Sequence, residues 1–293
     1  MQIFDRTIKE ILNQNLEKLE TFFTSDVVFY FGEIHPSYEK LFRDFIEILK
    51  EEEEDKDKEK KRLTILLNTP GGSAETVEKM VEIIRHHYEE VYFVVPDYAM
   101  SAGTIFCMSG DKIYMDYSSS LGPIDPQVFN GTTYVPAMGY LDKVNELLEK
   151  AKDGTLTQAE FLILQNQDLA MLRSYEQARE LTITLLKNWL VEYKFKDWIT
   201  HRTTTGKVGM PVTPEEKIQR AEDIADKLGD NKIWHSHGRM INLNTLKHVL
   251  KLEIEDYSEE KELRVLIRNY NDLLTEFIAR NGYKVFLHSR KYF

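Results

Sequence analysis

Apolar residues recur along this chain at two different spacings, and the alternation between them predicts a layered fold. Residues 6–23 and 36–49 carry apolar side chains at the three- and four-residue spacing of amphipathic helices. The apolar runs at 27–31, 64–68 and 91–95 have no such spacing and predict buried strands. Helices and strands therefore follow one another from the start of the chain.

The order of these elements predicts how the sheet is connected. A helix over 74–87 joins the second strand to the third, and a helix after Ser101 leads to a further strand at 112–116. Strands that alternate with helices are typical of parallel sheets with right-handed crossovers and helices on their faces. We expect an α/β fold with a mainly parallel sheet, covering helices and helical additions at both ends.

The second half of the sequence is predicted to be mostly helical. The helix within 211–228 opens with the start signal Thr213-Pro214-Glu215-Glu216. The other expected elements are helices over 140–152 and 157–195, a short helix after Arg239, a strand over 250–254 and a helix near 258–280.

These elements suggest three parts of the chain. We expect an N-terminal helix at 1–24, a central domain at 25–255 and a C-terminal helical arm at 256–293. The run EEEEDKDKEKK at 51–61 contains no apolar residue, so we interpret it as a solvated segment without a role in chemistry.

Composition and charge narrow the class of protein. With 293 residues, 42% of them apolar, the chain can bury a large core. A formal net charge of -11 without a basic stripe argues against nucleic acids and acidic lipid surfaces as partners. No run approaches the ~20 apolar residues of a membrane span, and the first residues lack the apolar core of a secretory signal. We expect a cytoplasmic protein.

Metal ions and cofactors are not expected. Cys107 is the single cysteine, so the chain can form neither an internal disulfide nor a cysteine-based zinc site. The histidines outside 235–239 are scattered without the spacing of metal ligands.

Two glycines and a serine are the candidates for chemistry. Gly71-Gly72 follow the strand at 64–68, and backbone amides without side-chain bulk can receive an oxyanion. Ser101 follows the strand at 91–95 at a strand-to-helix junction, which suits a nucleophile. Taken singly, the glycines would be an ordinary turn and Ser101 a helix cap. Their occurrence together favours catalysis.

Three segments in this order resemble the serine dehydrogenase proteinase family of the Clp-protease/crotonase superfamily, a relative of the signal peptide peptidases. They are LLNTPGGSAETVEKMVEIIR, VVPDYAMSAGTIFCMSGDKIYMDYSSSLGPIDPQV and KLGDNKIWHSHGRMINLNTL, within a resemblance that covers roughly residues 25–255. The resemblance implies an ATP-independent serine endopeptidase that forms an acyl-enzyme on peptides or unfolded proteins inside a homo-oligomer. It also implies that Ser101 is the nucleophile and that the amides of Gly71 or Gly72 and of Ala102 form the oxyanion hole.

The resemblance leaves the general base open. Clp proteases place a histidine about 25 residues after the serine, where this chain has Asp125, and an aspartate much later, near His237. An exchange of places would make His237 the base and Asp125 its orienting partner. Signal peptide peptidases use a lysine instead, and Lys187 or Lys143 would then serve. The unperturbed pKa of histidine suits a base near neutrality, which favours His237 over a lysine.

Other interpretations fit part of the same pattern. His235 is an alternative base, although it stands beside Trp234. A crotonase-like acyl-CoA enzyme would use the glycine loop for an enolate and would not need Ser101. A non-catalytic oligomeric scaffold would account for the missing histidine at the usual Clp position. A nicotinamide-dependent dehydrogenase is excluded because no Gly-x-Gly-x-x-Gly follows a strand.

Overall fold

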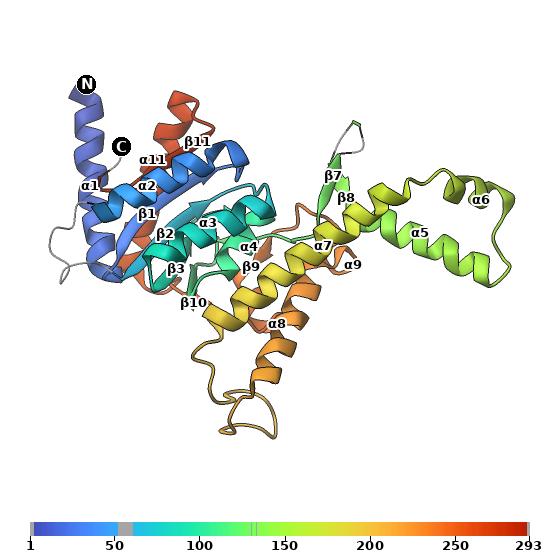
Figure 1. Ribbon diagram of the computed structural model, residues 1–293. Helices are drawn as coiled ribbons and strands as arrows, with labels where there is room; N and C mark the ends of the chain where they lie inside the picture. The colour runs from blue at the N-terminus through green and yellow to red at the C-terminus, as the bar shows by residue number, and fades with distance from the viewer. Residues whose placement is uncertain (1–2, 52–60, 130, 133, 292–293) are drawn as a thin grey trace.

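A six-stranded sheet forms the centre of the computed structural model, which describes residues 3–51, 61–129, 131–132 and 134–291 (Figure 1). Its strand order is β10-β5-β3-β2-β1-β11. All neighbours run parallel except β1 and β11. The strands are β1 (Asp26–Gly32), β2 (Arg62–Asn68), β3 (Glu90–Val95), β5 (Lys112–Met115), β10 (Glu255–Asp256) and β11 (Val285–His288). The predicted α/β fold with a mainly parallel sheet is confirmed.

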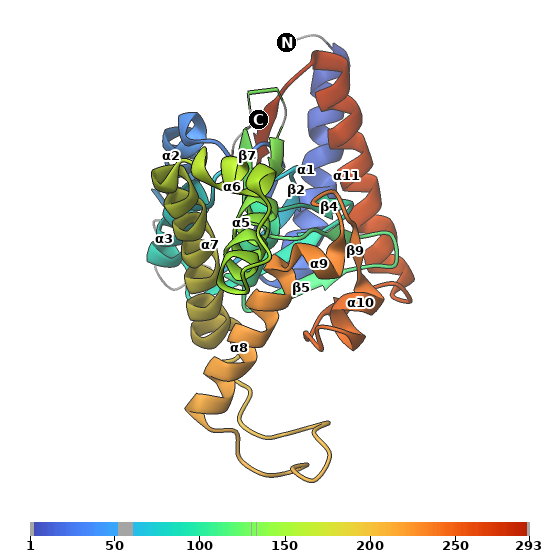
Figure 2. The same cartoon turned by 90° about the vertical axis from the view of Figure 1, so that its right-hand side faces the viewer.

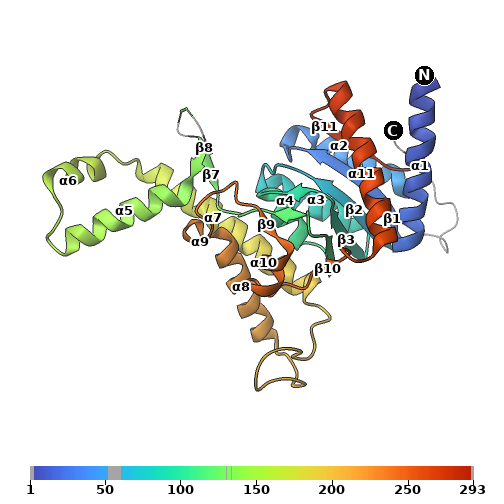
Figure 3. The ribbon, with the colours of Figure 1, turned by 180° about the vertical axis from the view of Figure 1, so that it is seen from behind.

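Helices cover both faces of this sheet. Because successive strand residues point to opposite faces, Val28 and Tyr30 enter one core while Val27 and Phe29 enter the other. On the second face α1 and α11 lie side by side, as Figures 2 and 3 show from two directions. The first face carries α2, α3 and α4. The bounds are α1 (Ile3–Phe23), η1 (Pro36–Tyr38), α2 (Glu39–Glu51), α3 (Ala74–His87), α4 (Ala102–Met108) and α11 (Lys261–Asn281).

Two smaller sheets follow the central one. The first has the order β4-β6-β9 and the second is the hairpin of β7 and β8. These strands are β4 (Tyr98–Ala99), β6 (Ser120–Leu121), β7 (Gln127–Phe129), β8 (Tyr134–Pro136) and β9 (Ile241–Asn242).

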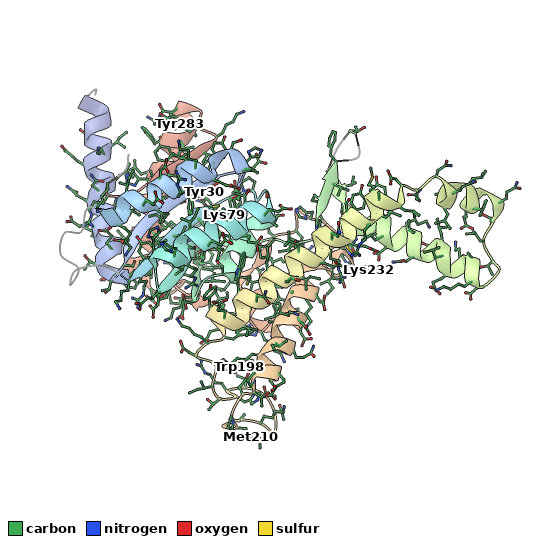
Figure 4. The ribbon with its side chains drawn as sticks, in the orientation of Figure 1. Tyr30, Lys79, Trp198, Met210, Lys232 and Tyr283 are labelled. Atoms are coloured by element: carbon green, nitrogen blue, oxygen red, sulfur yellow. The ribbon has the colours of Figure 1, made fainter. Side chains whose placement is uncertain are left out.

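A second group of helices, distinct from the C-terminal segment, projects from the body of the molecule and is called the arm below (Figure 1). The arm consists of α5, α6 and the start of α7. Its outer part is α5 and α6, and Lys232 of α9 pairs with Asp142 of α5 at 3.2 Å near the base of the arm (Figure 4). A separate loop before α8 protrudes below the body, with Met210 at its end (Figure 4). These helices are α5 (Ala137–Lys152), α6 (Gln158–Gln165), α7 (Leu169–Trp189), η3 (Leu190–Lys194), α8 (Pro214–Gly229), α9 (Asn231–Trp234) and α10 (Leu243–His248).

The single helix expected over 157–195 is wrong. The chain leaves the helical conformation between α6 and α7, where the Asp168 side chain accepts hydrogen bonds from the amides of Ala170 and Met171. Such a cap begins a new helix because its own backbone is extended. The helix that follows ends in the π-helical turn η3.

Two further differences concern strands. The strand expected over 250–254 is wrong, since those residues have no regular structure and only Glu255–Asp256 pair with β5. The prediction also missed β11, which follows α11 and pairs with the edge of β1. The charged run at 51–61 lies almost wholly outside the described residues. Among the described residues, no helix is long and apolar enough to cross a membrane.

Candidate active site

Three predicted site residues, Ser101, Asp125 and His237, lie beyond the same end of the sheet formed by β4, β6 and β9. Strands β4 and β6 run parallel, and Ser101 and Asp125 follow them in the chain. Strand β9 pairs antiparallel with β6, so the residues that precede β9, including His237, approach the end where β4 and β6 finish. The register of three short strands thus gathers segments that are far apart in sequence.

The glycine loop is bonded to the same sheet. The Thr69 amide donates to the Tyr98 carbonyl at 3.1 Å, and the Met100 amide donates to the Thr69 carbonyl at 3.0 Å. Gly71 has φ 106°, and a Cβ added there would lie 2.8 Å from the Cβ of Ser101. Only glycine leaves room for this contact, so the loop reaches the serine because residue 71 has no side chain.

Ser101 has a backbone conformation that is rare for a residue with a side chain. Its φ is 52° and its ψ is -118°, a strain of about 1–3 kcal/mol. It stands at the N-cap position of α4, yet its side chain makes no capping hydrogen bond. A serine held on a strained strand-to-helix turn is typical of nucleophiles. Ser101 therefore does not act as a helix cap through its side chain, because the hydrogen bond that defines such a cap is not formed.

Two backbone amides near Ser101 remain available to a ligand. The Gly71 amide donates to Thr69 Oγ1 at 3.0 Å and is therefore occupied. The amides of Gly72 and Ala102 have no acceptor within the described part of the chain. Ala102 is the first residue of α4, where amides have no intrahelical partner.

His237 and Asp125 form a hydrogen-bonded pair. His237 Nδ1 lies 2.9 Å from Asp125 Oδ1. The Asp125 side chain is 1% exposed, whereas that of His237 is 24% exposed. Gln127 Nε2 donates to Asp125 Oδ2 at 2.9 Å, so both oxygens of the buried carboxylate have partners. Gln127 was not predicted from the sequence, although a polar residue in the same turn as Asp125 was a signal for it.

The segment that contains Asp125 is fixed from two sides. The Ile124 amide donates to the Leu228 carbonyl at the end of α8, at 3.0 Å. The Ala137 amide, at the start of α5, donates to the Pro126 carbonyl at 2.9 Å. The start of the arm is therefore hydrogen-bonded to Pro126, the residue that follows Asp125.

Comparison with known proteins assigns the chain to a family. Residues 34–249 match the family model of the ClpP-like SDH-type serine proteinases. The chain belongs to this family. The resemblance inferred from the sequence is thereby confirmed.

Two curated relatives of this chain are uncharacterized proteins of Methanocaldococcus jannaschii. MJ0137 is 30% identical over 56% of this chain and 54% of its own length. MJ1495 is 28% identical over 49% of this chain and 44% of its own length. The chain spans about half the length of these relatives. A solved structure of the 1510-N membrane-bound stomatin-specific protease, in a mutant form, is 20% identical over 67% of this chain and 75% of its own, with a TM-score of 0.33.

The lysines expected as alternative bases lie in polar surroundings. Lys143 on α5 bonds with Glu146 at 2.9 Å, and Lys187 on α7 bonds with Glu222 at 3.0 Å. A lysine that acts as a base needs a desolvated environment instead. His235 is exposed and ends α9 in the left-handed conformation.

The one thiol of the chain is remote from water. Cys107 is fully buried in α4, and burial raises the pKa of its thiol. A thiol held protonated in this way is a poor nucleophile, which leaves the hydroxyl of Ser101 as the better candidate.

Proposed function

We propose that this protein is a serine endopeptidase in which Ser101 is the nucleophile, His237 the general base and Asp125 the residue that orients it. One observation carries the proposal: His237 and Asp125 are hydrogen-bonded at 2.9 Å, at the end of the small sheet where Ser101 leaves β4. The order in the chain is serine, aspartate, histidine. Triads are recognised by geometry and not by order.

The tautomer of His237 follows from its partner. The Asp125 carboxylate accepts a hydrogen bond from Nδ1–H, which leaves Nε2 of the neutral ring as a proton acceptor. In the proposed reaction Nε2 takes the Ser101 proton as Oγ attacks the peptide carbonyl. The imidazolium next to Asp125 then donates this proton to the departing amine. Water hydrolyses the acyl-enzyme by the same route, and no step consumes ATP.

The oxyanion hole is assigned to Gly72 and Ala102. Their amides lack acceptors within the described residues, while the Gly71 amide is bonded to Thr69. Donors that are already in place when charge develops on the carbonyl oxygen lower the barrier without reorganisation. In this proposal Gly71 supplies space beside Ser101 and Gly72 supplies the hydrogen bond.

We also propose that the substrates are peptides or unfolded proteins and that the protein acts as a homo-oligomer. Membership of a serine proteinase family supports the first statement. Apolar side chains exposed on the arm support the second, because single molecules rarely expose many of them together. They are Phe161, Leu162, Ile163, Leu169 and Met171.

The proposal is tested by labelling with a fluorophosphonate and mapping the modified peptide by mass spectrometry. We expect labelling at Ser101 that disappears in Ser101→Ala. Ser236→Ala is the control, because it removes an exposed hydroxyl next to His237 and should leave labelling unchanged. Labelling that survives in Ser101→Ala would defeat the nucleophile assignment. An unsubstituted protein that does not label would favour an acyl-CoA enzyme or a scaffold.

The same assay separates the candidate bases. His237→Gln should slow labelling about 10²–10⁴-fold, the usual contribution of a general base. Lys143→Met and Lys187→Met should each label at the rate of the unsubstituted protein. The opposite pattern would assign the base to a lysine.

A further inference from the structure

A buried asparagine of the C-terminal helix lies beneath the two loops of the proposed site. Asn271, on α11, is 2% exposed although its side chain is polar. Its Oδ1 accepts a hydrogen bond from Asn68 Nδ2 at 2.5 Å. Its Nδ2 donates to Asp97 Oδ2 at 2.8 Å. A buried polar side chain costs stability unless it is bonded, and here both ends of the amide have partners.

The two partners stand at the base of the two catalytic loops. Asn68 is the last residue of β2 and precedes the Thr69-Pro70-Gly71-Gly72 segment. Asp97 follows β3 and precedes β4, after which the chain reaches Ser101. Asn271 therefore joins the loop with the proposed oxyanion amide to the loop with the proposed nucleophile.

The direction of these hydrogen bonds is fixed by charge. A carboxylate only accepts hydrogen bonds when ionised, so the Asp97 carboxylate requires the NH₂ group of Asn271 on its side. The amide oxygen of Asn271 must then face Asn68, which in turn presents its own NH₂ group. The chain of polar contacts has one favourable arrangement, and this arrangement specifies how the loops sit relative to α11.

The helix that provides Asn271 lies outside the segment shared with the family. The family match ends at residue 249, while α11 spans Lys261–Asn281. We infer that Asn271 is a positioning residue of the proposed peptidase, which holds the glycine loop and the Ser101 loop in register from below. The inference rests on the proposed function. It gives the C-terminal helix a part in catalysis as well as in the core.

The test replaces Asn271 with leucine, which keeps the branched shape and the number of heavy atoms and removes both hydrogen bonds. We expect the rate of fluorophosphonate labelling at Ser101 to fall about 10–100-fold, since small displacements of reacting groups have effects of this size. With a peptide substrate the loss should appear in kcat while KM is retained. Asp97→Asn, at an exposed position, should give a smaller loss in the same direction.

Tyr270→Phe is the matched control. Tyr270 is the preceding residue of α11, is also buried, and bonds His288 Nδ1 at 2.6 Å, away from both loops. It should lower stability through the lost buried hydrogen bond but label at the normal rate. An equal loss of labelling in Tyr270→Phe would reduce Asn271 to a general contributor to stability and overturn the inference.

Amide hydrogen exchange provides a readout that does not depend on activity. In Asn271→Leu the segments 68–73 and 97–103 should exchange faster than in the unsubstituted protein, and in Tyr270→Phe they should not. Normal labelling with unchanged exchange in Asn271→Leu would refute the positioning role and leave the proposed function intact. If the unsubstituted protein fails to label, the proposed function falls, and exchange alone decides whether Asn271 orders the loops.

Discussion

At the scale of single residues, the site depends on backbone conformations that most residues avoid. The positive φ of Ser101 is compensated by the first turn of α4, where the amides of Thr104 and Ile105 both donate to the Ser101 carbonyl. Those bonds keep the serine in place while its Cβ stays beside Gly71. The strain and the close contact belong to one arrangement.

Gly71→Ala tests the close contact. The new methyl group would lie 2.7 Å from the Met100 carbonyl oxygen and 2.8 Å from Ser101 Cβ, so it must displace the serine. We expect fluorophosphonate labelling to fall about 100-fold, as for the loss of an oxyanion donor.

Gly131→Ala is the control for this substitution. Gly131 has a similar φ of 95°, but an added Cβ there would meet no atom of the described residues within 4 Å. It should share the backbone strain without the loss of labelling. Equal labelling of the two variants would show that Gly71 does not constrain Ser101.

The sequence could predict the main candidates of the site but not all of their partners. Ser101 and the glycines stand in recognisable motifs. The pairing of Asp125 with His237 was expected only from the family resemblance, because nothing local indicates that these distant segments meet. The role of Thr69 as acceptor for the Gly71 amide was hidden, because it depends on a turn whose geometry forms only in the fold. Asn271 looked like an ordinary polar residue of a helix.

At the scale of elements, the shortest strands matter most for the site. Strands β4, β6 and β9 have two residues each, too few for any hydrophobic period to reveal. The long strands of the central sheet were predictable because each is a buried apolar run. Strand β11 is no shorter than β5, which was predicted, but it lies at the edge of the sheet after a long helix, outside the alternation of strands and helices that indicated the others.

Strand β11 gives the fold a dependence on pH. His288 is fully buried, its Nδ1 is hydrogen-bonded to the Tyr270 hydroxyl, and its pKa is lowered by burial to about 3. Below pH 6.5 the His288 imidazole is protonated in the unfolded chain but stays neutral in the folded chain, so stability falls as pH decreases from 6.5 toward 3. This group alone should lower the free energy of unfolding by about 2 kcal/mol between pH 7.5 and pH 5.

Urea unfolding at the two pH values measures this effect. His288→Gln keeps an acceptor for Tyr270 and removes the titration, so its stability should change less between pH 7.5 and pH 5. The difference between the two proteins isolates His288 from the carboxylates. Identical pH dependence would contradict the assignment.

At the scale of the whole molecule, the arm projects from a compact body, and no other described element packs on its outer part (Figures 1 and 3). Leu169, at the start of α7, is 77% exposed. The arm has a small core of its own around Leu141 and Leu172, between α5 and α7. It can hold its shape and still offer apolar side chains to another surface.

Assembly through the arm is testable by mass. Replacing both Leu162 and Ile163 with serine removes exposed apolar groups from α6 without touching a buried residue. We expect a lower molar mass by light scattering after gel filtration, because association driven by apolar burial weakens. The control is Val208→Ser with Met210→Ser, on the protruding loop, which should keep the original mass. An unchanged mass in the α6 variant would place any interface elsewhere.

The hydrogen bond between the Ala137 amide and the Pro126 carbonyl connects the arm directly to the segment that contains Asp125. Pro126 directly follows the aspartate that holds the imidazole, and Ala137 begins the helix that leads out to the tip. In the proposed peptidase, a partner bound at the tip would therefore act on the chain segment next to Asp125, and assembly through the tip would influence catalysis.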